Sequence, residues 1–158
     1  MPDSTMPNRP YLTTRAHRAF GLAHRLARAT DDAQVTARML AASAIRQRGL
    51  LAAALQQRGL DLQQLEAELM PDLPEQAADS DTSATLEWTA WDEAVLAHAR
   101  EEADAMGMEH FSTEHLLVSL IRDQDSEAAR VLARHGVSYA LLREDLRQVY
   151  QHSKPGSA

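Results

Sequence analysis

Residues 112–122 have the sequence STEHLLVSLIR, the clearest helix signal in the chain. Ser112 carries the short side-chain oxygen that accepts a backbone N–H bond at the start of a helix. The apolar residues after it share helical spacing, three or four positions apart: Leu116, Leu117, Leu120 and Ile121. The stretch therefore predicts a helix that begins at Thr113 and buries a leucine-rich face.

Helix starts and stops recur along the rest of the chain. Gly59, Gly107 and Gly136 each end an apolar-periodic run and are followed by an apolar residue, which is typical of helix ends. The candidate capping residues are Thr89 with Asp92 and Asp61 with Gln64 as capping boxes, and Ser112, Ser126 and Ser138 as single caps.

Eight helices are predicted from these signals. They span Thr13–Ala29, Thr36–Gln47, Leu50–Arg58, Leu62–Leu69, Ala90–Met106, Thr113–Arg122, Glu127–His135 and Tyr139–Gln151. No segment shows the period-two alternation that a half-buried strand needs, and Val and Ile are sparse. The predicted fold class is all-α.

The first four helices align with the last four. At an offset of 76 positions Thr13 aligns with Thr89. After the next loop the offset becomes 77, and Gly59 aligns with Gly136. One residue is thus missing from a loop of the first half, a change that duplicated structures tolerate. The sequence predicts two tandem four-helix repeats that form a pseudo-twofold bundle of eight helices.

Composition shifts set the predicted domain boundaries. They are a flexible N-terminus at 1–11, a first, degenerate repeat at 12–70, an acidic linker at 71–85, a second repeat at 86–151 and a disordered tail at 152–158. Pro71 and Pro74 block helix continuation at the start of the linker.

The overall composition excludes several classes of protein. The 158 residues are 44% hydrophobic and 25% charged, ordinary values for a globular domain. They contain no cysteine, which excludes disulfides and thiolate metal sites. No apolar run is long enough for a membrane span, and the N-terminus has no secretory apolar region. A net charge of −7 argues against sequence-independent nucleic-acid binding. A cytoplasmic protein is expected.

The net charge is divided unevenly between the halves. Residues 1–70 hold nine Lys and Arg against six Asp and Glu, a net of +3, whereas residues 71–158 hold seven against seventeen, a net of −10. Either the two halves face each other or are solvated differently, or one of them offers a polar docking surface to a partner.

Three segments of the second half carry a family resemblance. Residues 88–103 (WTAWDEAVLAHAREEA), 112–122 (STEHLLVSLIR) and 128–137 (AARVLARHGV) resemble the repeat found in the N-terminal domain of Clp-type AAA+ unfoldases. The similarity is to the ClpC type, strong over about residues 86–150 and weaker over 12–70. In that family two such repeats, joined by a linker, precede the ATPase modules.

The first half departs from this family pattern. It has Ala37-Arg38-Met39 where the second half has Thr113-Glu114-His115. The sequence also lacks a G-x-x-x-x-G-K-[ST] motif, so we expect a stand-alone domain without the AAA+ modules.

The resemblance implies a non-catalytic peptide- and protein-binding module, an adaptor or regulator of a ClpC-type unfoldase or protease. Its expected partners are the unfoldase, its adaptors or its substrates, among them arginine-phosphorylated proteins. Nucleic acid, membrane and cofactors are not expected. Two alternatives stay open: a sink for phosphoarginine or another small ligand, and a structural or oligomerising module whose binding surface has decayed.

The candidate ligand-binding residues are those at the helix start, Ser112, Thr113, Glu114 and His115. One interpretation is local capping with a carboxylate that the helix dipole favours. The other is ligand capture, in which the carboxylate holds a guanidinium while hydroxyls and backbone N–H groups hold an attached phosphoryl group. The resemblance implies a phosphoarginine role for Glu114, and Arg38 at the matching place of the first half should repel a guanidinium.

Trp88 and Trp91 are candidate partner-binding residues. They lie three positions apart at the end of the linker, in a chain with 4% aromatic residues. One is expected to pack into the seam between the repeats. The other is either core as well or an exposed anchor for a partner.

No catalytic or metal site is predicted. His110 and His115 are five positions apart rather than the four of a zinc helix, and no G-x-S-x-G motif occurs. His17, His24 and His98 are expected to lie on helices and to be amphipathic or partly exposed. The adjacent Glu101 and Glu102 are interpreted as a solvated face.

Overall fold

The structure is a computed structural model that describes residues 11–29, 35–71 and 88–153. Its helices are α2 (Thr14–Ala29), α3 (Ala37–Arg46), α4 (Leu50–Gln57), α5 (Leu62–Leu69), α6 (Ala90–Ala105), α7 (Thr113–Ile121), α8 (Glu127–Arg134) and α9 (Tyr139–Ser153). Within the described ranges the extended backbone is limited to one isolated parallel bridge, between Leu12 and Phe111. The all-α prediction is confirmed, and each helix bound lies within two residues of its predicted position.

Almost all of the predicted N-terminal segment, linker and tail lies outside the described residues, at 1–10, 72–87 and 154–158. The described part of α9 continues to Ser153, two residues into the predicted tail. In the described part of the chain, no helix combines the length and the apolarity needed to cross a membrane.

Glycines end three helices as predicted, and all three have positive φ: Gly59 at 83°, Gly107 at 75° and Gly136 at 80°. At the end of α8 the Gly136 N–H donates to Ala133 O at 2.9 Å and the Val137 N–H donates to Leu132 O at 3.0 Å. This pair of backbone hydrogen bonds is the Schellman motif, which needs a residue in the left-handed region. Val137 is buried, so this helix end also directs the chain back into the core.

The predicted side-chain caps hold at Thr89, Asp61, Ser126 and Ser138, with one difference in the Asp61 box. The Thr89–Asp92 capping box of α6 is complete. Asp61 caps α5 by accepting the N–H bonds of Gln63 and Gln64. The Gln64 side chain does not return a bond to Asp61 and instead donates to Glu68 at 3.3 Å. The second half of this predicted capping box is therefore absent.

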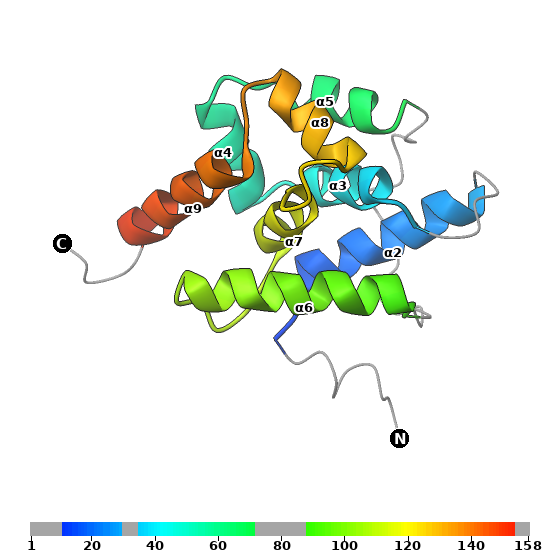
Figure 1. Ribbon diagram of the computed structural model, residues 1–158, viewed down its shortest axis with the longest axis horizontal. Helices are drawn as coiled ribbons and strands as arrows, with labels where there is room; N and C mark the ends of the chain where they lie inside the picture. Colours follow the sequence, from blue (N-terminus) through cyan, green and yellow to red (C-terminus); the bar gives the residue numbers. More distant parts are fainter. Residues whose placement is uncertain (1–10, 30–34, 72–87, 154–158) are drawn as a thin grey trace.

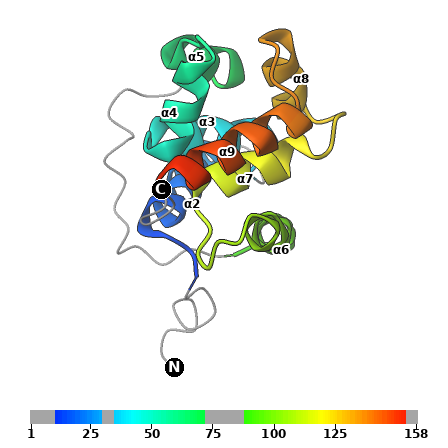
Figure 2. The same ribbon diagram turned by 90° about the vertical axis from the view of Figure 1, so that its left-hand side faces the viewer.

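The eight helices form one bundle around α3 and α7, which pack on each other (Figure 1). Helices α2 and α6 lie at one end and α5 and α8 at the other, as both views show (Figure 2). The packing of α3 on α8 is matched by that of α7 on α4, and the packing of α5 on α8 by that of α9 on α4. Exchanging the two sets of four helices preserves these pairs, which is the pattern of two tandem repeats.

Opposite charges meet across the two repeats. Arg38 of α3 pairs with Glu127 of α8 at 3.0 Å. Arg58, after α4, holds both carboxylate oxygens of Asp145 in α9. In both pairs the cation belongs to the basic half and the carboxylate to the acidic half. These contacts favour the interpretation in which the two halves face each other.

Candidate functional site

The start of α7 lies inside the bundle. Thr113, Glu114 and His115 have exposed fractions of 0%, 6% and 1%, and Ser112 is half-buried. Every residue from Thr113 to Ile121 is buried, so α7 is a core helix and not a surface helix with a single apolar stripe. The predicted binding residues at this helix start are therefore brought together, but they are buried or half-buried.

The first repeat fixes this helix start. The Thr13 hydroxyl donates to the Ser112 hydroxyl at 2.7 Å. Beside it, the Thr13 N–H donates to Phe111 O at 3.1 Å and the Phe111 N–H donates to Tyr11 O at 2.9 Å. The residues that open the first repeat thus form a short extended pairing with those that open α7, and the Ser112 hydroxyl is engaged in it.

A directed chain of hydrogen bonds runs through the site. The Ser112 N–H donates to His115 Nδ1 at 3.0 Å, so in the neutral imidazole the proton belongs on Nε2. Nε2 lies 2.9 Å from the Tyr150 hydroxyl and can donate to it. The Tyr150 hydroxyl in turn donates to Glu114 Oε2 at 2.6 Å. Each donor therefore has one acceptor, and the carboxylate ends the chain.

Burial keeps two donors of this hydrogen-bonded chain, the His115 imidazole and the Tyr150 phenol, in their neutral forms. Desolvation lowers the pKa of His115, against the smaller raising effect of the Glu114 and Glu102 carboxylates. Desolvation, together with the Glu114 charge and hydrogen bond, raises the pKa of Tyr150 far above its usual value. Both shifts favour a neutral imidazole and a neutral phenol beside the carboxylate.

The arrangement is a buried acceptor covered by a phenol. In the described residues no Lys or Arg forms an ion pair with Glu114, and the Tyr150 hydroxyl is the hydrogen-bond donor to its side chain. A guanidinium that binds Glu114 Oε2 would compete with the Tyr150 hydroxyl for this oxygen. Sequence reasoning missed Tyr150, although its spacing of four from the buried Leu146 and eight from Leu142 places it on the inward face of α9.

The tryptophans lie elsewhere. Trp88 packs edge-on against Phe20 of α2, with ring centroids 5.1 Å apart, and lies 6.1 Å from His17. It therefore contacts the first repeat, as expected for a residue in the seam. Trp91 is half-buried and packs on the core, and its role in partner binding stays a prediction. Both tryptophans lie at the start of α6, whereas the loop into α7 leaves the other end of this helix (Figure 1).

The matching place in the first repeat has a different chemistry. Thr36 still caps α3 by accepting the Met39 N–H. Arg38 takes the position that corresponds to Glu114, and its guanidinium pairs with Glu127 of the second repeat. This place is therefore used for contact between the repeats.

Two expectations about charged residues were wrong. Glu102 is 3% exposed, because Arg143 at 2.8 Å and the Tyr139 hydroxyl at 2.6 Å draw it into the bundle. His24 is also buried, where it bonds Asp92 at 2.8 Å. Both side chains are stabilised by partners distant in sequence. In the described ranges, no group of three or more His, Asp or Glu is arranged to hold a metal ion.

A comparison with protein families agrees with this architecture. The model described as Clp repeat (R) N-terminal domain matches residues 11–135 and, in a second match, residues 92–157. The chain belongs to this family.

Individual relatives support the assignment. The negative regulator of genetic competence ClpC/MecB of Bacillus subtilis is 34% identical over 76 residues, which are 48% of this chain and 9% of that protein. The ATP-binding subunit ClpC of the Staphylococcus epidermidis Clp protease is 33% identical over 60 residues, which are 38% of this chain and 7% of the subunit. The chain thus matches less than a tenth of the length of these relatives.

Two solved structures share the fold. The N-terminal domain of ClpD from Arabidopsis thaliana has a TM-score of 0.59 at 22% identity, covering 89% of this chain and 95% of that one. The Hsp104 N-terminal domain from Candida albicans has a TM-score of 0.65 at 17% identity, covering 93% of each chain.

Proposed function

We propose that this chain is a non-catalytic protein-binding module that acts as an adaptor or regulator of a ClpC-type unfoldase. It binds the unfoldase, its adaptors or its substrates. The observation that carries the proposal is the doubled Clp-repeat fold, shared with the N-terminal regions of ClpC relatives.

The mechanism is mass action. A module that occupies a ligand of the unfoldase lowers the free concentration of that ligand, whereas one that holds substrate and unfoldase together raises their effective concentration. The two modes predict opposite effects on degradation. A titration of the module into a degradation assay distinguishes them by its sign.

The test is binding of the purified 158-residue chain to a purified ClpC-type unfoldase, with and without an adaptor protein. We expect a complex in the micromolar range, as for transient interfaces, and a change in the degradation rate of an unfolded substrate. Trp91→Ala removes a half-buried aromatic, and Arg147→Ala, on the exposed face of α9, is the surface control. Absence of both binding and any rate change would overturn the proposal.

A second candidate is capture of a guanidinium, as in phosphoarginine, at Glu114. The observation that favours it is a buried carboxylate whose partner is a neutral phenol and not a cation. A ligand at Glu114 Oε2 competes with the Tyr150 hydroxyl. Calorimetry with free phosphoarginine should therefore give more heat with Tyr150→Phe than with the wild type. No heat from either protein at millimolar ligand removes this candidate.

A further inference from the structure

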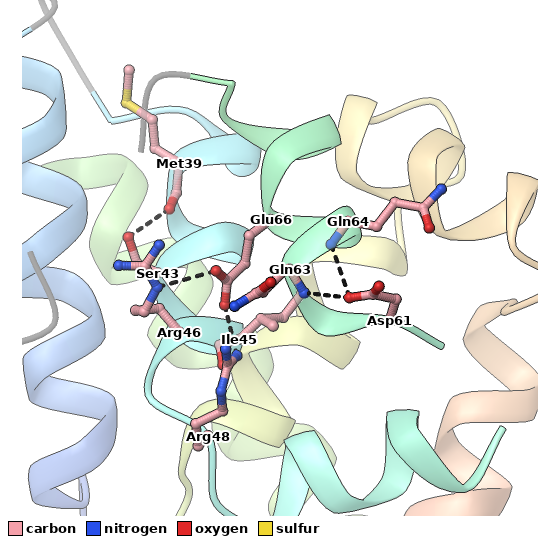
Figure 3. Close-up of polar contacts among 9 residues, drawn as sticks. All are labelled: Met39, Ser43, Ile45, Arg46, Arg48, Asp61, Gln63, Gln64 and Glu66. Carbon is pink, nitrogen blue, oxygen red and sulfur yellow. Dashed lines mark hydrogen bonds and ion pairs between the residues drawn. The ribbon is translucent and has the colours of Figure 1, made fainter. Parts of the chain in front are cut away.

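The first repeat carries a polar pocket of about 390 Å³ at the junction of α3 and α5. Arg46, Arg48, Gln63 and Glu66 line its polar side (Figure 3). Ala67, Met70 and Pro71 complete the wall with mostly apolar surface. None of these residues belongs to the second-repeat site, and the pocket lies on the half that has lost the Thr-Glu-His triplet.

Two arginines share one buried carboxylate in this pocket. Arg46 Nε donates to Glu66 Oε1 at 3.1 Å, and Arg48 Nη1 donates to Oε2 at 2.6 Å. Figure 3 shows Glu66 pointing between the two guanidinium groups. Since Glu66 is 4% exposed, its charge is compensated inside the protein.

Arg48 has donors to spare. Its Nη1 bonds Glu66 and the Ile45 carbonyl, the latter at 3.0 Å. Its Nε and Nη2 have no hydrogen-bond partner among the described residues, and the side chain is 42% exposed. A guanidinium binds a carboxylate through such a pair of N–H groups.

The backbone at Arg48 is unusual. Its φ is 62°, and it is the one residue other than glycine with positive φ in the described ranges. This left-handed conformation costs free energy for a residue with a Cβ, and such residues concentrate at functional sites. It forms where the first repeat has one residue fewer than the second. There the longer loop carries Asp123 and Asp125, so the second repeat has no matching basic loop.

We propose that this pocket binds a single carboxylate of a peptide that carries an apolar side chain next to it. The geometry of Arg48 selects the ligand class, because its Nε and Nη2 form the side-by-side pair of N–H donors that matches the two oxygens of a carboxylate. The neighbouring apolar side chain packs on Ala67 and Met70. This inference rests on the proposed binding function and gives the first repeat a ligand of its own.

The test is an NMR titration of the ¹⁵N-labelled full chain with three leucine-based probes and, separately, with inorganic phosphate. N-acetyl-leucine carries a terminal carboxylate, N-acetyl-leucyl-glutamate amide carries a side-chain carboxylate, and N-acetyl-leucinamide carries none. We expect the amide signals of Gln63, Ala67 and Met70 to shift with one or both carboxylates, at a Kd of about 1–10 mM for so small a ligand. The stronger carboxylate probe identifies the source as a chain end or an acidic side chain.

Arg48→Gln should weaken this binding about tenfold, as expected from the loss of a charge-assisted pair. Arg130→Gln makes the same charge change at an exposed position of α8 and should leave the binding unchanged. Equal shifts with N-acetyl-leucinamide, tighter binding of inorganic phosphate, or an unaffected Arg48→Gln variant whose spectrum stays folded would each overturn the inference. The titration contains no unfoldase, so its failure leaves the proposed function untouched. Loss of unfoldase binding, conversely, leaves the pocket result standing.

Discussion

Removing the Tyr150 hydroxyl tests whether the second-repeat site is held closed by one phenol. In Tyr150→Phe the Glu114 carboxylate, 6% exposed, loses its 2.6 Å donor, and His115 Nε2 loses its 2.9 Å partner. A hydrogen bond to a charged group contributes about 1.5–3 kcal/mol, and a buried group left without a partner costs about as much. We expect the free energy of unfolding to fall by about 2–3 kcal/mol.

The chain supplies a matched control. The hydroxyl of Tyr139, which also lies in α9, donates to the buried carboxylate of Glu102 in α6 at 2.6 Å. Glu102 keeps the Arg143 guanidinium at 2.8 Å when the phenol oxygen is removed. Tyr139→Phe should therefore cost only about 1 kcal/mol.

Urea unfolding followed by circular dichroism at pH 7.5 measures both variants. Thermal melts should agree, with Tm lowered by about 2–4 °C per kcal/mol for a chain of this size. A double-mutant cycle with Glu114→Gln isolates the part of the Tyr150 effect that depends on the carboxylate charge. If Tyr150→Phe costs no more than Tyr139→Phe, or shows no coupling to Glu114, the assignment of a closed hydrogen-bonded chain is refuted.

Three further predictions use the same unfolding assay. Because burial lowers the pKa of His115 below the unfolded value of about 6.5, the unfolded chain binds a proton that the folded chain does not. Stability should therefore fall as pH drops below about 6.5, by at most about 1.4 kcal/mol per pH unit, and His115→Gln should flatten this slope relative to wild type. Asp92→Ala removes the carboxylate that completes the α6 capping box and bonds His24, so it should cost about 2–4 kcal/mol; a loss below about 1 kcal/mol would contradict this. Gly49→Ala should cost about 1–2 kcal/mol, because φ is 83° and the new Cβ would lie 2.7 Å from the Arg15 guanidinium; an unchanged midpoint would show that this turn relaxes freely.

The helices and their duplication could be read from local sequence patterns. A glycine followed by an apolar residue has few backbone solutions, so Gly59, Gly107 and Gly136 mark helix ends wherever the chain goes next. Capping serines and threonines are equally local, because their side chains accept a backbone N–H bond from two or three residues further on. Local rules of this kind also fixed the register of the two repeats, since Thr36 and Ser112 occupy matching caps.

The candidate site was only partly predictable. The Thr113-Glu114-His115 triplet could be singled out because it is contiguous and lies at a helix start. The burial and hydrogen bonding of the triplet could not be predicted, because the donor to Glu114 is the hydroxyl of Tyr150, 36 positions away. Glu102 was misjudged for the same reason, since helical spacing locates a residue on a helix face but not the partner that this face meets.

Which charges are buried and which pocket is open depends on how the helices pack together. Arg46, Arg48 and Glu66 are separated by up to twenty positions, and nothing in their spacing indicates that two guanidinium groups meet on one carboxylate. Backbone hydrogen bonds along a helix are local, so sequence determines them. The pairing of side chains between helices depends on how eight helices pack together, and that packing is a property of the whole chain.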